Sequence, residues 1–172
     1  IRTVCIYCGV GCNLDVAVVN KKVKSIQAPY DAEVNQGHTC LKGRFAFSFS
    51  NNPDRLRTPL IRKEGELLPA TWDEAYDYIA SKLTTIKNEY GPDSIGGISS
   101  ARCTNEENYL MQKFIRAVIG TNNIDSCARV CHSPTALGMQ RVFGTGAATN
   151  SIVDLNYTNC IMVIGANPTD AH

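Results

Sequence analysis

The sequence predicts an α/β chain in two parts: a small β-rich domain over residues 1–56, then the start of a parallel-sheet α/β domain over residues 57–172. In the first part, cysteines are frequent and β-prone runs are short. In the second part, amphipathic helical patterns alternate with short apolar runs. The order strand, helix, strand, helix, strand implies right-handed crossovers, and therefore a parallel sheet.

The first part contains one predicted hairpin and one short helix. Residues 13–20 and 23–28 are β-prone and flank a turn at Asn20-Lys21-Lys22, which predicts two antiparallel strands. Residues 41–50 predict a short helix. The cysteine-bearing segments therefore lie between short elements joined by tight turns.

The second part begins with a hairpin and a long helix. Residues 60–70 predict a hairpin that turns at Glu64-Gly65. Thr71 and Glu74 have the spacing of a capping box, which predicts the start of an amphipathic helix. Gly91-Pro92 ends this helix.

Three further strands and two further helices complete the pattern. Buried strands are predicted at residues 94–100, 122–125 and 160–165. A helix over residues 108–120 has a capping box formed by Thr104 and Glu107. A last helix opens with Ser133-Pro134 as its N-cap and first helical residue.

Composition and charge argue against several classes of partner. The chain has 17 basic and 16 acidic residues and a formal net charge of +1, without a block of like charge. Nucleic acid and anionic membrane surfaces are therefore not expected as partners. No apolar run is long enough to cross a bilayer. The chain begins at Ile1 and stops just after an expected strand, so we expect it to be a piece of a longer protein.

Four of the eight cysteines form an ordered set near the N-terminus: Cys5, Cys8, Cys12 and Cys40. Two residues lie between Cys5 and Cys8, three between Cys8 and Cys12, and 27 between Cys12 and Cys40. Four thiolates are what a 4Fe–4S cluster requires, and Gly9 and Gly11 allow the backbone to approach closely. A four-cysteine zinc site and disulfides are the alternatives, but zinc sites usually pair two Cys-x-x-Cys knuckles. The spacing favours the cluster.

A second cysteine feature lies in residues 126–135, where Cys131 stands directly beside His132. Loops that follow parallel strands meet at the ligand-binding edge of a sheet, and residues 99–108 and 165–172 form two more such loops. Taken alone, Cys131 can be a nucleophile, a metal ligand or a small buried side chain. The remaining three cysteines match no ligand pattern, and the last is expected in the core: Cys103, Cys127 and Cys160.

The motifs together resemble a known family. The matching segments are CIYCGVGC (5–12), CLKGR (40–44), CARVCH (127–132) and IGANPTDAH (164–172). They occur in the same order as in catalytic subunits of molybdenum- or tungsten-dependent formate dehydrogenases, which are members of the molybdopterin oxidoreductase superfamily. The first motif is shared across that superfamily, whereas CARVCH is more specific to formate dehydrogenases.

The resemblance implies a role for each matching residue. The implied 4Fe–4S ligands are Cys5, Cys8, Cys12 and Cys40. Lys42 is implied to lie between the cluster and the proximal pterin. Cys131 stands where the family has the cysteine or selenocysteine that binds Mo or W, and His132 is the implied active-site histidine. The implied contacts of the bis-molybdopterin guanine dinucleotide are Asn105, Glu106, Gly165, Ala166 and Asn167.

The implied reaction is the reversible oxidation of formate to CO2. Electrons pass from the metal through the pterin and the cluster to an iron–sulfur or flavin subunit of a hetero-oligomeric, cytoplasmic complex. The family's catalytic subunits are several times longer than this chain, so the arginine that orients formate lies outside it.

Other readings remain open at this point. One is formylmethanofuran dehydrogenase or another molybdopterin oxidoreductase, such as a nitrate reductase. A second is an electron-transfer subunit that keeps the cluster but lacks Mo or W, and a third is a zinc-binding interaction module. Mo and W are not distinguished.

Overall fold

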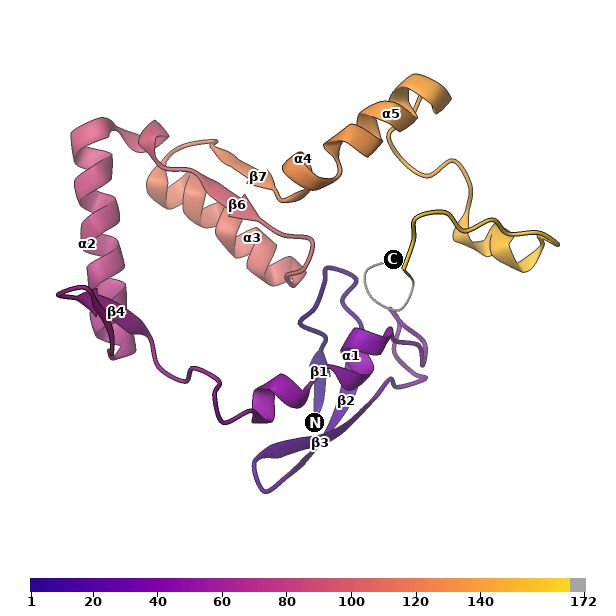
Figure 1. Cartoon of the computed structure of the whole chain (residues 1–172), viewed down its shortest axis with the longest axis horizontal. Helices are drawn as coiled ribbons and strands as arrows, with labels where there is room; N and C mark the ends of the chain where they lie inside the picture. Colours follow the sequence, from indigo (N-terminus) through magenta and orange to yellow (C-terminus); the bar gives the residue numbers. More distant parts are fainter. Residues whose placement is uncertain (168–172) are drawn as a thin grey trace. The chain divides into compact units, whose positions relative to one another are not determined.

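The computed structural model describes residues 1–167. The chain divides into two compact units, residues 1–125 and residues 126–172. Figure 1 traces the strands and helices of the first unit and the helices of the second. The fold is mixed α/β with a β-rich N-terminal region, as the sequence predicts.

The N-terminal region is a three-stranded antiparallel sheet in the order β1 (Arg2–Val4), β2 (Asn13–Val19) and β3 (Lys22–Gln27). Val19 pairs with Lys22, so the hairpin loop is Asn20-Lys21. Both loop residues have positive φ, 50° and 61°, as a type I′ turn requires. This turn matches the twist of the strands, and the predicted hairpin is confirmed.

A short helix follows the sheet. α1 (Leu41–Phe45) begins directly after Cys40, whose extended backbone forms the N-cap. A 3₁₀ turn, η1 (Ser48–Asn51), completes the segment. The predicted helix over residues 41–50 is therefore present in two pieces.

The next two elements agree with their local sequence patterns. β4 (Leu60–Lys63) and β5 (Glu66–Pro69) pair through a turn at Glu64-Gly65, where both φ values are positive. α2 (Trp72–Tyr90) begins with the predicted capping box: the Glu74 N–H donates to Thr71 Oγ1 at 3.2 Å, and the Thr71 N–H donates to Glu74 Oε2 at 2.8 Å. Gly91 ends α2 at a φ of 84°.

A strand–helix–strand segment follows the short turn η2 (Pro92–Ser94). β6 (Gly97–Ser99) and β7 (Ile124–Ser126) form a small parallel sheet. α3 (Asn105–Lys113) connects them and continues as a π-helix, η3 (Phe114–Ile119). Thr104 caps α3 with Glu107, as predicted. The predicted helix thus starts three residues earlier, and its last six residues have the wider π-helical turn.

The core of this segment is formed by three isoleucines: Ile95, Ile115 and Ile119. Ile115 and Ile119 come from the π-helical turn and are only 2% and 3% exposed. A Cβ atom on Gly97 would lie 2.8 Å from Ile115 Cγ1, so the glycine lets the helix approach β6 closely. The core is small because the sheet has only two strands here.

The second unit contains α4 (Ala128–Cys131), α5 (Ser133–Phe143) and the 3₁₀ turn η4 (Ile152–Asn156). The expectation that Ser133 caps α5 is wrong by one position, because His132 is the N-cap and Ser133 is already helical. The Ser133 hydroxyl instead donates to the Arg129 carbonyl at 2.7 Å. It therefore satisfies a carbonyl at the end of α4 and not an N–H of α5.

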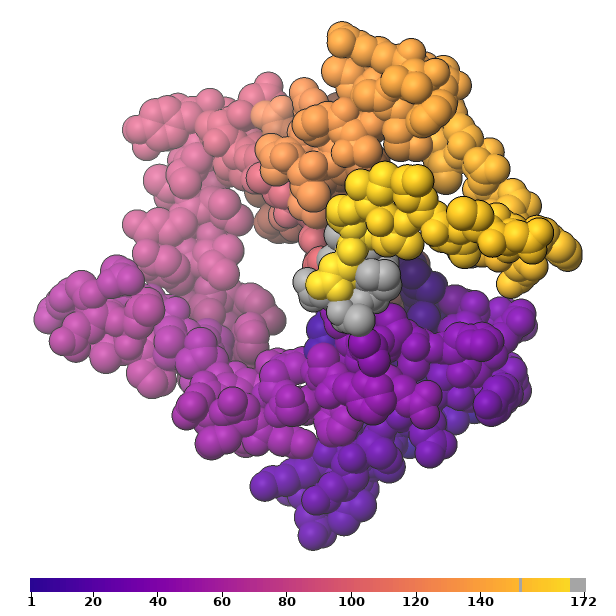
Figure 2. Space-filling view, turned by 45° about the vertical axis from the view of Figure 1, so that its right-hand side comes forward, coloured from indigo at the N-terminus to yellow at the C-terminus, as the bar shows by residue number. Residues whose placement is uncertain are grey.

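The strand predicted over residues 160–165 does not form. This segment has no regular structure, and Cys160, which was expected in the core, is exposed. The apolar side chains that follow it are also exposed: Ile161, Met162, Val163 and Ile164. The yellow part of the described chain lies on the surface in Figure 2. A central strand needs neighbours on both edges, and in the described residues this segment pairs with none.

Candidate functional site

The N-terminal sheet brings two of the predicted cluster ligands together. The Cys5 N–H donates to the Cys12 carbonyl at 2.8 Å, which extends the β1–β2 pairing by one step. Cys8 lies in the loop between them, and this loop contains Gly11 at a φ of 77°. Gly11 adopts this left-handed conformation without strain because glycine has no Cβ, and the loop can close there.

The fourth predicted ligand, Cys40, is the residue that precedes α1. The helix packs directly on the Cys5 side chain: a Cβ on Gly43 would lie 3.4 Å from Cys5 Sγ and 2.5 Å from Thr39 Oγ1. Gly43 is buried, and Cys5 is only 6% exposed. α1 can therefore approach the sheet this closely because residue 43 is a glycine, which has no side chain.

The four thiols influence one another electrostatically. Burial raises the pKa of Cys5, and the neighbouring Cys8 and Cys40 raise it further. Burial likewise raises the pKa of Cys12, and the other three thiols add to the effect. Four thiolates at such a site repel one another unless a cationic group is bound.

These residues fit an iron–sulfur cluster. None of the four cysteines forms a disulfide in the described residues. Within residues 1–167, no three acidic, cysteine or histidine side chains are close enough to hold one metal ion. Four cysteine thiols are the donor set of a 4Fe–4S cluster, in which each cysteine binds one iron.

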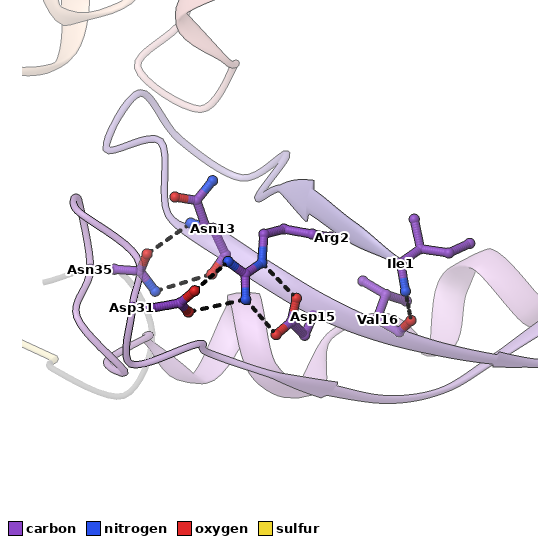
Figure 3. A network of polar contacts seen from close by, with 7 residues as sticks. All are labelled: Ile1, Arg2, Asn13, Asp15, Val16, Asp31 and Asn35. Atoms are coloured by element: carbon purple, nitrogen blue, oxygen red, sulfur yellow. Dashed lines mark hydrogen bonds and ion pairs between the residues drawn. The ribbon is translucent and has the colours of Figure 1, made fainter.

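Polar contacts of Arg2 and Asn35 join segments of this region outside the cysteines, and Figure 3 shows them. The Arg2 guanidinium forms ion pairs with Asp15 and Asp31, both at 2.9 Å, and thereby lowers the pKa of each carboxyl group. The Asn35 amide bonds to both backbone groups of Asn13. The sequence alone did not single out Asn35, because nothing local marks a loop asparagine as buried.

Two predicted pterin-site residues lie at the start of α3. Asn105 is the first residue of the helix, and its Nδ2 donates to the Gly9 carbonyl at 2.8 Å. A Cβ on Gly9 would lie 2.8 Å from Asn105 Oδ1. Asn105 therefore contacts the cysteine loop. Glu106 is exposed in the first turn of the same helix, and Lys42 is half-buried on α1.

The predicted metal ligand and its histidine lie at the junction of α4 and α5. Cys131 is the last residue of α4, and its side chain is exposed. The His132 N–H donates to the Ala128 carbonyl at 2.8 Å, which keeps the junction helical. His132 is exposed as well. The short helix thus presents both side chains to the solvent.

The third predicted loop lies at the end of the described chain. Gly165 has a φ of 61°, and Ala166 and Asn167 are exposed. The rest of the IGANPTDAH motif lies outside the described residues. In the part of the chain that is described, no helix is both long and apolar enough to cross a membrane.

Two sequence profiles together cover nearly the whole chain. The Fe4S4 domain of the molybdopterin oxidoreductases matches residues 1–52, and the molybdopterin oxidoreductase profile matches residues 55–172. The chain belongs to the molybdopterin oxidoreductase family. The first match contains all four cysteines discussed above, and the second contains Cys131 and His132.

Individual relatives agree with this assignment. Over 172 residues, the chain is 48% and 46% identical to the alpha subunits of F420-dependent formate dehydrogenases 1 and 2 of Methanococcus maripaludis. The alignments cover all of this chain and 25% of each relative, so the chain spans about a quarter of their length. Among solved structures, acetylene hydratase from Pelobacter acetylenicus matches with a TM-score of 0.58 and 26% identity, over 81% of this chain and 20% of that one.

Proposed function

We propose that the full-length protein is the catalytic subunit of a formate dehydrogenase, which interconverts formate and CO2 at a Mo or W bis-molybdopterin guanine dinucleotide centre. The likeness that carries the proposal is the 48% identity, over the whole chain, to the alpha subunit of an F420-dependent formate dehydrogenase. The adjacent Cys131 and His132, exposed between two helices, support it.

The N-terminal residues are proposed to hold the 4Fe–4S cluster. Its ligands are Cys5, Cys8, Cys12 and Cys40. When bound, the metal–pterin group supplies the two-electron chemistry, and the cluster supplies one-electron transfer. Lys42, two residues after Cys40 on α1, is proposed to carry a positive charge between the two groups.

The second unit is proposed to supply the metal ligand and the proton acceptor. Position 131, as a cysteine thiolate or a selenocysteine selenolate, would hold Mo or W, for which a soft ligand is suited. His132 would accept the proton released when the C–H bond of formate breaks, because an imidazole nitrogen can act as a general base. The proposed pterin contacts are Asn105, Glu106, Gly165, Ala166 and Asn167.

The organisation of the whole protein follows from the same proposal. Residues 1–56 form the cluster domain, and residues 57–172 begin the pterin-binding domain. Electrons leave through an iron–sulfur or flavin subunit in a hetero-oligomeric, cytoplasmic complex. The relatives named as alpha subunits support an assembly with other subunits.

A second candidate is another reaction of the same family. It is favoured by the structural match to acetylene hydratase, an enzyme whose name denotes addition of water rather than oxidation of formate. A formylmethanofuran dehydrogenase or an electron-transfer subunit without Mo or W would also fit the N-terminal region. The fold therefore does not decide the reaction, and the chemistry must be measured.

The deciding experiment uses the full-length protein, purified without oxygen together with its partner subunits. We expect formate-dependent dye reduction, iron for the cluster and one Mo or W per catalytic subunit. Cys131→Ala should abolish dye reduction and leave the iron content unchanged, because the cluster ligands are untouched. Cys160→Ala is the matched control, a cysteine outside every ligand pattern, and should remain active.

Three results would contradict the proposal or redirect it. Full activity of Cys131→Ala would show that the thiol is not the metal ligand. Iron with Mo or W but without formate oxidation would favour another family reaction. Iron alone, in protein purified with its cofactor retained, would favour the electron-transfer subunit. Selenium in the wild type would identify position 131 as selenocysteine.

A further inference from the structure

The Asn35 side chain is buried, and its oxygen and its nitrogen both form hydrogen bonds. It is only 9% exposed, although it lies in a loop. Its Oδ1 accepts a bond from the Asn13 N–H at 2.8 Å. Its Nδ2 donates to the Asn13 carbonyl at 3.1 Å and to the His38 carbonyl at 2.7 Å. Both polar atoms of the amide therefore have partners, as a buried amide requires.

These three bonds join the segments that carry two cysteines. Asn13 directly follows Cys12, and His38 lies two residues before Cys40. Along the chain, 27 residues separate the two cysteines. The Asn35 side chain thus links the residue after Cys12 to the residue two positions before Cys40.

The Asn35 amide takes the place of a missing strand. β3 pairs with β2 only from Asp15, which lies opposite Gln27. Beyond that point, Asn13 has no third-strand partner, and its N–H and carbonyl are satisfied by the Asn35 amide (Figure 3). The sheet edge is therefore completed by a side chain that also reaches the segment before Cys40.

The ion pair between β1 and the loop that contains Asp31 is a weaker constraint. Arg2 on β1 forms an ion pair with Asp31, but their side chains are 48% and 72% exposed. Exposed ion pairs are screened by water and salt and hold the chain only loosely. The buried amide, with bonds to backbone atoms, is the more specific constraint.

We propose that Asn35 is a positioning residue for the iron–sulfur cluster: its amide fixes Cys40 relative to Cys12 and so retains the fourth iron. This inference rests on the proposed cluster ligands. Three ligands lie within eight residues of one another, from Cys5 to Cys12, whereas the fourth arrives from a distant segment. That ligand is the one whose position depends on a tertiary contact.

The test compares substitutions at two asparagines in the full-length enzyme. Asn35→Asp keeps the acceptor for the Asn13 N–H but removes both donated bonds, and Asn35→Ala removes all three. Asn51→Asp is the matched control, because the Asn51 amide also donates to a backbone carbonyl of the same sheet, Val23, at 2.9 Å. Asn51 follows α1 and is remote in sequence from the segment between Cys12 and Cys40.

The measurement is the type of cluster in the folded enzyme. An oxidised 4Fe–4S cluster is silent in electron paramagnetic resonance, whereas a 3Fe–4S cluster gives a signal. We expect a several-fold larger three-iron signal in Asn35→Asp and a still larger one in Asn35→Ala, with iron falling from four toward three per cluster. Asn51→Asp should match the wild type. If Asn35→Ala does not fold, Asn35→Asp decides the outcome.

Two results would overturn the inference while leaving the proposed function intact. One is a complete four-iron cluster in both Asn35 variants. The other is equal cluster loss in the Asn35 and Asn51 variants, which would show only a general loss of stability. A wild-type enzyme without iron would overturn the proposed function, and this inference with it.

Discussion

Gly43 shows how a single absent side chain shapes the cysteine site. The first turn of α1 lies against Cys5, and the space that a Cβ would need is occupied by Thr39 Oγ1 and approached by Cys5 Sγ. In a helix, alanine is otherwise favoured over glycine by about 1 kcal/mol. Overpacking a tight contact costs about 1–3 kcal/mol. For Gly43→Ala, the steric cost is therefore expected to exceed the gain in helix propensity.

We predict that Gly43→Ala in the full-length enzyme lowers iron content and the thermal midpoint of the cluster's visible absorbance. Adding Thr39→Ala removes the atom 2.5 Å from the new Cβ and should restore most of the loss. Iron analysis and thermal bleaching of the wild type, Gly43→Ala and the double variant measure the effect. A Gly43→Ala enzyme that is more stable than the wild type would show that helix propensity outweighs the contact.

At the residue scale, a sequence can indicate a site where its residues have a local spacing, and the roles of those residues stay predictions. The set from Cys5 to Cys40 and the Cys131-His132 pair are recognisable without a structure. Asn35 and Gly43 are not, because their importance comes from contacts between distant segments. Asn105 was expected to contact the pterin, and the contact seen in the described residues is with Gly9.

At the scale of elements, α3 links the two parts that the sequence separates. The Thr104–Glu107 capping box fixes where the helix begins, and this places Asn105 at its first position. From there, the Asn105 amide reaches the Gly9 carbonyl, 96 residues earlier in the chain. The helix start therefore supports the loop between Cys8 and Cys12.

This contact predicts non-additive behaviour of two substitutions. Gly9→Ala should destabilise the cluster loop, because its Cβ would lie 2.8 Å from Asn105 Oδ1. Asn105→Ala removes an exposed hydrogen bond, which costs about 0.5–1.5 kcal/mol. In the double variant the clash is absent, so we expect a coupling of about 0.5–3 kcal/mol. Denaturant-induced loss of the cluster absorbance measures it, and additivity within about 0.5 kcal/mol would contradict the contact.

The sequence predicted the elements that depend on a few neighbouring residues, and it failed for elements that depend on packing against distant segments. Both hairpins and both capping boxes are confirmed, since turn residues and caps act over two to four positions. The π-helical turn before Gly120 was missed, because it depends on how Ile115 and Ile119 pack into the core. The prediction of a strand over residues 160–165 was wrong for this chain, because an apolar run becomes a strand only when neighbouring strands are present to pair with it.

At the scale of the whole molecule, the exposed apolar surface agrees with a chain that spans about a quarter of its relatives. Trp72 and Tyr76 form a tilted aromatic pair on α2 with ring centroids 5.7 Å apart, yet both are 60% exposed. Ile161 and Ile164 are similarly open to solvent, at 59% and 80%. Such surface is normally covered in a folded protein.

We predict that residues 161–164 become a buried strand in the full-length enzyme. Their backbone amides should exchange hydrogen about 10³-fold more slowly there than in the isolated 172-residue chain, which corresponds to an opening free energy of about 4 kcal/mol. Exchange measured by mass spectrometry on both proteins makes the comparison, and peptides from β2 serve as the internal control. Equally fast exchange in both would mean that this segment is a surface loop.

The Asn35 contact also has a consequence for the β2–β3 hairpin. The amide connects the base of this hairpin to the segment before Cys40, so the tip at Asn20-Lys21 lies outside the connection. A change confined to the Asn20-Lys21 tip therefore leaves the Asn35 bonds unchanged. A reporter or an affinity tag attached at this tip is expected to leave the link between the segments of Cys12 and Cys40 in place.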